Sequence, residues 1–200
     1  MNYALYVTHP EVILDPAEPS TRWHLSDRGR ERATAGGRSA AMQPIGLIIA
    51  SPETKTMETA KLLAGSGKEI VVGEDTHENV RTSTGLVTAL EFEALMDALY
   101  ARPKESAAGW ETLDGTTRRI VSAIDAALAR HSDRAPIAFV GHGTVGTLLK
   151  CHLARRPPTR DEDQRRMAHP GGGNVFGFSL DDRRLLSDWV AMEDFDGLPG

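Results

Sequence analysis

The feature that most constrains this chain is the alternation of short apolar runs with helical segments. Four runs rich in β-branched residues predict buried strands, at residues 3–7, 45–50, 69–72 and 136–140. Helical spacing predicts helices at about 27–42, 51–65, 87–100 and 111–129, and another after residue 143. Strands that alternate with helices form a mainly parallel sheet covered on both faces. We therefore predict one three-layer α/β/α domain over residues 1–200, with a small helical insertion at about 83–110.

Local signals place some of the element boundaries. Ser51 is expected to cap the second helix, with Pro52 at its first helical position. Residues 174–190 resemble a hairpin, and the tail from residue 193 is expected to be loose.

Charge and cysteine content exclude several classes of protein. The net charge is −5, so no basic excess is present to neutralise phosphates of a nucleic acid or a membrane surface. The one cysteine, Cys151, cannot form an intramolecular disulfide, which fits a reducing compartment. No apolar run approaches the roughly 20 residues of a membrane helix, and the first residues lack the pattern of a signal peptide. We expect a cytoplasmic protein with no nucleic-acid or membrane partner.

Chemically active side chains follow the predicted strands. His9 comes after the first strand, Lys55 after the second, Glu78 and Arg81 after the third, and His142 after the fourth. The carboxyl ends of parallel strands share one edge of a sheet, where ligands bind in open α/β folds. Helix N-termini at the same edge favour an anion such as phosphate.

Each of these residues has a plainer interpretation when taken alone. His9 before a proline could be a turn residue, and Lys55 could be an exposed helix cation. Any catalytic role of Glu78 could instead belong to another acid, and the rivals are Glu53, Glu74 and Asp75. The convergence of two histidines on one edge favours a functional site.

The segment around His142 resembles a dinucleotide-binding loop. Gly141, Gly143 and Gly146 spell G-x-G-x-x-G after a strand. That interpretation requires an acid at the end of a second strand, and the segment around Asp161 contains no strand. We interpret the loop as one that positions His142 at the end of the strand, with Gly143 as the first residue of a helix whose N-terminus faces phosphate.

Two histidines, a cation and a carboxylic acid suit phosphoryl transfer through a phosphohistidine, with no metal or other cofactor. A cysteine phosphatase would need an arginine six positions after Cys151, where Pro157 stands. A zinc hydrolase would need a compact ligand motif, which the histidines do not form.

The same residues resemble the histidine phosphatase superfamily, also called phosphoglycerate-mutase-like. The resemblance rests on four segments in order: "LYVTHPE", "WHLSDRGRERA", "IASPETKTMETA" and "GHGTVGTLL". It implies His9 as the phosphorylated nucleophile, His142 as the second histidine and Glu78 as the proton donor. It also implies a small phosphorylated substrate and leaves a homodimer open; the phosphate-binding candidates are Thr8, Lys55, Arg81 and Gly143.

The chain departs from the family pattern at the nucleophile. Thr8 and Pro10 stand where the family has Arg and Gly, and Lys55 replaces a second arginine. Two guanidinium forks are thereby lost, although Arg81 or Arg22 could restore a positive charge. The first hypothesis is a phosphomonoesterase that acts through His9. The alternative is a weakened or inactive member that binds a phosphorylated ligand. Specificity is expected to come from residues 83–110 and 155–173.

Overall fold

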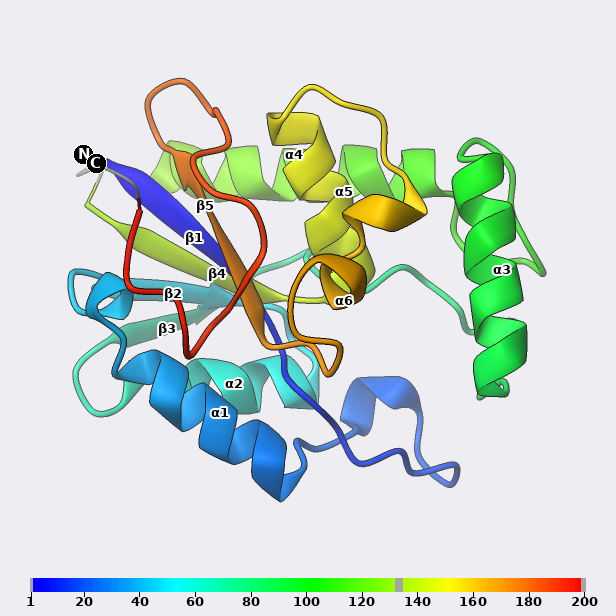
Figure 1. Ribbon diagram of the computed structural model, residues 1–200, viewed down its shortest axis with the longest axis horizontal. Coiled ribbons are helices and arrows are strands. Elements are labelled where there is room, and N and C mark those ends of the chain that lie inside the picture. Colours follow the sequence, from blue (N-terminus) through cyan, green and yellow to red (C-terminus); the bar gives the residue numbers. More distant parts are fainter. Residues whose placement is uncertain (1, 132–134, 199–200) are drawn as a thin grey trace.

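A six-stranded sheet forms the centre of the computed structural model, which describes residues 2–131 and 135–198 (Figure 1). Its strand order is β3-β2-β4-β1-β5-β6. The first four strands in the chain run parallel, whereas β5 is antiparallel to β1 and β6 to β5. The predicted mainly parallel sheet is confirmed. The strands are β1 (Tyr3–Thr8), β2 (Leu47–Ala50), β3 (Glu69–Val72), β4 (Ile137–Gly141), β5 (Asn174–Ser179) and β6 (Val190–Ala191).

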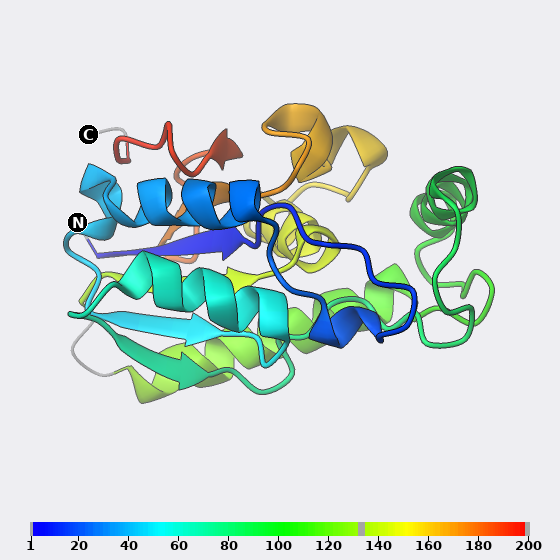
Figure 2. The same cartoon turned by 90° about the horizontal axis from the view of Figure 1, so that it is seen from below.

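Helices cover both faces of this sheet (Figure 2). α1 and α2 pack on one face, and α4 and α5 pack on the other, as the two main apolar clusters record. The three-layer α/β/α architecture is therefore confirmed. The helices are α1 (Asp27–Gly37), α2 (Thr54–Ala64), α3 (Ala89–Ala101), α4 (Leu113–Arg130), α5 (Gly143–Leu153) and the single turn α6 (Gln164–Met167).

Side-chain alternation along β1 connects the two halves of the core. Ala4 and Tyr6 join the cluster under α4 and α5, whereas Leu5 and Val7 join the cluster under α1 and α2. All four side chains are at most 1% exposed. The register Thr8↔Gly141 then brings the ends of β1 and β4 together, and with them the residues that follow each strand.

Two helix boundaries differ from the sequence prediction. The second helix starts at Thr54, because Ser51 is fully buried and bonds to a histidine instead of capping the helix. The first helix ends at Gly37, where a Cβ would lie 2.9 Å from the carbonyl oxygen of Leu62. This close approach of α1 to α2 is followed by a separate 3₁₀ turn at Ala40–Met42.

The tail is more ordered than expected. Phe195 is 4% exposed and packs in the cluster under α1 and α2. Its aromatic side chain buries enough apolar surface to hold the chain end against the fold.

The predicted insertion contains α3, which begins with a capping box formed by Thr88 and Glu91. It packs on the rest of the fold through a third apolar cluster: Met96, Leu99, Trp110, Leu113 and Leu148. Arg160 and Arg165 extend from the 155–173 segment to Glu93 of α3. The two segments predicted to set specificity are therefore joined to each other. Among the described helices, none is long and apolar enough to cross a membrane.

Candidate active site

His9 follows β1 and is held from two sides. Its backbone N–H donates to the carbonyl oxygen of Gly141 (3.0 Å), which extends the pairing of β1 with β4. Its Nδ1 lies 2.9 Å from the carbonyl oxygen of Pro10. A carbonyl only accepts, so Nδ1 carries the proton and Nε2 keeps its lone pair. Burial, together with the positive charges of His142 and Lys55, lowers the pKa of His9 to about 3.

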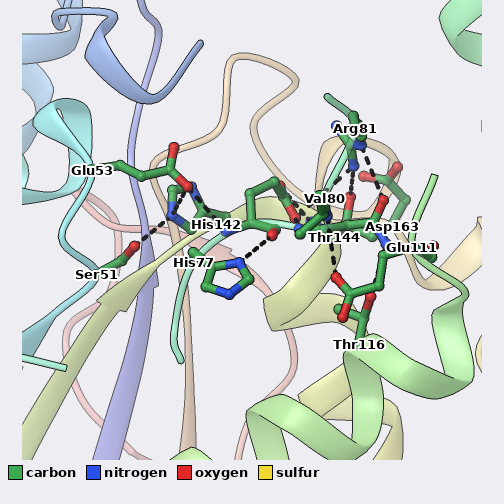
Figure 3. A network of polar contacts seen from close by, with 12 residues as sticks. Ser51, Glu53, His77, Val80, Arg81, Glu111, Thr116, His142, Thr144 and Asp163 are labelled. Atoms are coloured by element: carbon green, nitrogen blue, oxygen red, sulfur yellow. Dashed lines mark hydrogen bonds and ion pairs between the residues drawn. The ribbon is translucent and has the colours of Figure 1, made fainter. Parts of the chain in front are cut away.

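His142 lies beside His9 at the end of β4. The ring centroids are 5.4 Å apart and the planes are inclined at 72°. The His142 side chain is fully buried, and its Nε2 lies 2.8 Å from Oγ of Ser51 and 3.3 Å from Oε1 of Glu53 (Figure 3). Its Nδ1 is buried without a hydrogen bond to any described residue. Burial is the main reason that the pKa of His142 falls to about 3, despite the nearby carboxylate of Glu78.

The glycines around His142 make room for Tyr6 of β1. A Cβ on Gly141 would lie 2.2 Å from the Tyr6 hydroxyl, and one on Gly146 would lie 2.4 Å from its ring. The hydroxyl accepts from the backbone N–H of His142 (3.1 Å). The glycines are therefore explained by Tyr6, which packs against them and holds the backbone of His142 by a hydrogen bond.

Glu78 approaches the site from the segment after β3. Its Oε2 accepts from the backbone N–H of Thr144 (3.4 Å) in the first turn of α5, and its Oε1 accepts from the N–H of Asn79 (2.8 Å). Burial alone would raise the pKa of Glu78. The charges of Arg81 and the two histidines, with the Asn79 hydrogen bond, lower it to about 2.

Arg81 also reaches the start of α5. It donates to Oγ1 of Thr144 (2.7 Å), and its guanidinium lies 3.9 Å from Glu78. The rings of Phe92 and Trp110, each 5.0 Å away, support the guanidinium. The insertion thus positions the one candidate arginine that lies at this edge.

Lys55 is placed at the same edge, but its ammonium is already paired. Its Nζ donates to Oε2 of Glu53 (2.5 Å) and to the carbonyl oxygen of Ser20 (2.7 Å). Lys55 and Glu53 are 5% and 7% exposed. Glu53 was considered only as a rival to Glu78; the structure instead places its carboxylate between Lys55 and His142.

Thr8 is also engaged with protein partners. Its hydroxyl donates to Oε1 of Gln164 (2.6 Å) and accepts from the backbone N–H of Asn174 (2.9 Å). Gln164 lies in an irregular polar segment and Asn174 is the first residue of β5, so no sequence pattern marks either of them as part of the site. Their only signal was the glycine-rich stretch between them, at residues 171–173.

That glycine stretch is fixed by Arg32 of α1. The guanidinium donates to the carbonyl oxygens of Gly172 (2.7 Å) and Gly173 (3.1 Å), and it forms a two-pronged pair with Glu193. The backbone N–H of Gly173 donates to the carbonyl oxygen of His9 (3.0 Å). Arg32 therefore ties the loop to the segment that carries the nucleophile candidate.

Other candidates lie elsewhere. The Arg22 side chain is 72% exposed and pairs with Glu18. Glu74 and Asp75 are exposed at the end of β3. Within the part of the chain that the structure describes, no three His, Cys, Asp or Glu side chains are grouped so as to hold a metal ion.

Solved structures of similar fold are phosphatases and related proteins. A mycobacterial glucosyl-3-phosphoglycerate phosphatase in complex with inorganic phosphate superposes with a TM-score of 0.76 at 17% identity, over 98% of this chain and 100% of that one. A variant of phosphoserine phosphatase from Entamoeba histolytica, in complex with phosphoserine, gives 0.75 at 16% identity, over 98% and 100%. Bacillus stearothermophilus YhfR gives 0.75 at 18% identity, over 92% and 93%.

A search of curated protein sequences returns no significant match. The family model for the histidine phosphatase superfamily (branch 1) matches residues 17–187. The match begins after His9. It covers most of the chain, and it includes Lys55, Glu78, Arg81 and His142. The chain belongs to the histidine phosphatase superfamily, branch 1.

Proposed function

We propose that this protein hydrolyses phosphomonoesters through a phosphohistidine at His9. The observation that carries the proposal is the His9–His142 pair at the carboxyl edge of the sheet, with Nε2 of His9 unprotonated. A neutral imidazole can attack phosphorus, and the lowered pKa keeps His9 neutral at physiological pH.

In the first step, a bond forms between Nε2 of His9 and phosphorus while the ester P–O bond breaks. Glu78, which is ionised at rest, takes the proton of the substrate monoanion and passes it to the departing oxygen; its carboxyl group borders the first turn of α5. In the second step, water attacks phosphorus, the N–P bond breaks, and Glu78 takes up the proton from the water. Inorganic phosphate then leaves with that proton, and Glu78 returns to its ionised starting state.

The phosphoryl group is expected to lie between the two histidines and the N-terminus of α5. The backbone N–H of Gly143 and the helix dipole favour its negative charge. Arg81 and Lys55 add positive charge nearby, and the neutral ring of His142 lies beside His9. Thr8 acts indirectly, through the partners of its hydroxyl.

A second function is favoured by one observation. The Glu53 carboxylate neutralises Lys55 within the site. A site with reduced positive charge could bind a phosphorylated ligand without hydrolysing it, because the developing charge of the transition state would be poorly stabilised.

The deciding experiment compares wild type with His9→Ala on an aryl phosphate in the presence of a chelator. We expect turnover that requires His9 and an acid-labile phosphoenzyme in the wild type alone. His152→Ala, at an exposed histidine of α5, is the matched control and should behave as wild type. Equal and negligible rates in wild type and His9→Ala would refute the phosphatase. Retained binding of inorganic phosphate would then support the ligand-binding alternative.

A further inference from the structure

Gln164, the first residue of α6, is a nearly buried side chain whose orientation is fixed. It is 5% exposed, and its Oε1 accepts from Oγ1 of Thr8 (2.6 Å) and from Nδ2 of Asn174 (2.8 Å). Asn174 is itself oriented, because its Nδ2 donates to the carbonyl oxygen of His169 while its Oδ1 accepts from the N–H of that residue. An NH₂ group cannot accept these bonds, so the oxygen of Gln164 must face Thr8.

The amide nitrogen of Gln164 consequently points away from Thr8, toward two glycines. A Cβ on Gly143 would lie 2.6 Å from Nε2, and one on Gly172 would lie 3.6 Å from it. Gly143 follows His142 and opens α5. A Cβ on Gly172 would lie 2.6 Å from the carbonyl oxygen of His9. Nε2 is therefore situated between the segments that carry the two histidines.

This nitrogen has no acceptor of its own in the structure. None of the residues in the described ranges, 2–131 and 135–198, accepts a hydrogen bond from Nε2 of Gln164. Gln164 is only 5% exposed, so this nitrogen has little access to water as a partner. An unpaired donor beside the N-terminus of α5 favours a ligand that supplies oxygen atoms.

We propose that Nε2 of Gln164 donates a hydrogen bond to a phosphoryl oxygen of the bound ligand, with Thr8 and Asn174 as positioning residues. A neutral carboxamide then supplies a donor at a site where Thr8 cannot contribute a charge and Lys55 is paired with Glu53. The inference rests on the proposed function only in assigning a phosphate to this site. It requires binding of phosphate and does not require turnover.

The test measures the affinity for inorganic phosphate by calorimetry at pH 7. Gln164→Glu keeps the acceptor for Thr8 and Asn174 but replaces the donor with a carboxylate oxygen, so we expect affinity to fall by at least about 100-fold. Gln164→Met removes the donor without adding charge and should lower affinity about 10-fold or more. Gln43→Glu, at an exposed glutamine, makes the same charge change outside the site and should leave affinity unchanged.

A second pair of variants covers the case in which substitution of Gln164 disturbs folding. Thr8→Val removes the hydroxyl that orients the amide, and we expect this variant to bind phosphate more weakly than wild type. The Gln43→Glu control should have an unchanged melting temperature with phosphate bound. Thr8→Ser keeps the hydroxyl and should restore wild-type affinity. If Gln164→Met, or Thr8→Val where Gln164→Met does not fold, binds phosphate as wild type does, the inference is overturned.

The two proposals fail in different ways. Phosphate binding that depends on Gln164, without any turnover that depends on His9, would refute the phosphatase and leave this inference standing. Turnover that depends on His9, together with phosphate binding that is unaffected by substitution of Gln164, would support the phosphatase and refute this inference. Absence of phosphate binding by the folded wild type would overturn the role of Gln164.

Discussion

Oε1 of Glu53 lies 3.3 Å from Nε2 of His142, and Oε2 of the same carboxylate lies 2.5 Å from Nζ of Lys55. One buried acid therefore contacts both a histidine and the lysine of the candidate site. A carboxylate only accepts hydrogen bonds, so it favours a proton on Nε2 of His142 and leaves the lone pair on Nδ1. It also places a negative charge close to where the proposed phosphate binds.

Glu53→Gln should therefore strengthen the binding of phosphate. Removing one negative charge about 5 Å from the anion corresponds to about 3 kcal/mol at an effective dielectric constant of about 20. We expect the dissociation constant for inorganic phosphate to fall at least about tenfold in calorimetry. Glu69→Gln, on exposed β3, is the control and should not change it. Weaker phosphate binding by Glu53→Gln would mean that positioning of His142 outweighs charge.

Glu78→Gln should affect substrates according to their leaving group. The proposed acid matters most where the departing oxygen is strongly basic, so alkyl phosphates should lose about 10²- to 10⁴-fold in kcat. A dinitrophenyl phosphate, whose leaving group needs no proton, should lose far less. Steady-state kinetics on both substrates measure the difference. Glu74→Gln serves as the control at a nearby exposed acid, and a uniform loss on both substrates would remove the acid role from Glu78.

The pH profile of kcat/KM should not show the rise near pH 6.5 that deprotonation of an ordinary histidine would cause. The pKa values of His9 and His142 are about 3 and that of Glu78 is about 2, so above pH 4 both imidazoles are neutral and Glu78 is ionised. The proton for the leaving group must then arrive with the substrate monoanion, whose second pKa is about 6. We expect kcat/KM to fall about tenfold per pH unit above that value. A rise between pH 5 and 7 with an apparent pKa near 6.5 would contradict this assignment.

Acid should destabilise the fold partly through His142. Its pKa is lowered in the folded state, so the unfolded chain binds more protons as pH falls below 6.5, and stability declines toward pH 3. Between pH 6.5 and 4.5 the loss for this one buried group is at most about 3 kcal/mol. Urea denaturation of His142→Asn should show a shallower decline of the unfolding free energy over that window than wild type. Parallel curves for the two proteins would argue against a neutral, buried His142.

Arg32→Lys should loosen the loop at residues 171–173. A lysine cannot reproduce the guanidinium contacts with Glu193 and with two glycine carbonyls. We expect a loss of about 2–4 kcal/mol in the unfolding free energy from urea denaturation. Arg28→Lys, at an exposed arginine of the same helix, should cost almost nothing. An equally small loss at Arg32 would show that the loop is held by other contacts.

Periodicity was sufficient to predict the four parallel strands and the layer architecture. Buried parallel strands have a nearly continuous apolar sequence, and they remained recognisable here without any aligned relatives. The helix start near Ser51 was placed wrongly, because its hydroxyl bonds to a histidine 91 positions away. Local capping signals carry no information about such a distant partner.

The candidate site was only partly predictable for a similar reason. His9, Glu78 and His142 could be identified because each follows a strand of recognisable pattern. Gln164 could not, since α6 is a single turn in an irregular segment and its partner Thr8 lies 156 positions away. Glu53 was visible as an acid, but only the fold shows that it neutralises Lys55.

The Tyr6 ring beneath Gly141 and Gly146 changes what the G-x-G-x-x-G pattern means in this chain. Gly141 and Gly146 are required because the Tyr6 ring leaves no room for a Cβ at either position. The requirement does not depend on a bound pyrophosphate. Position 6 should therefore covary with positions 141 and 146 among relatives, and a smaller residue there would release both glycines from their constraint. A pattern search that treats the three letters as a nucleotide signature would record a false positive whose origin is core packing. For protein design, the same contact means that any substitution of Tyr6 in β1 also changes the support of the His142 backbone, so the two must be designed together.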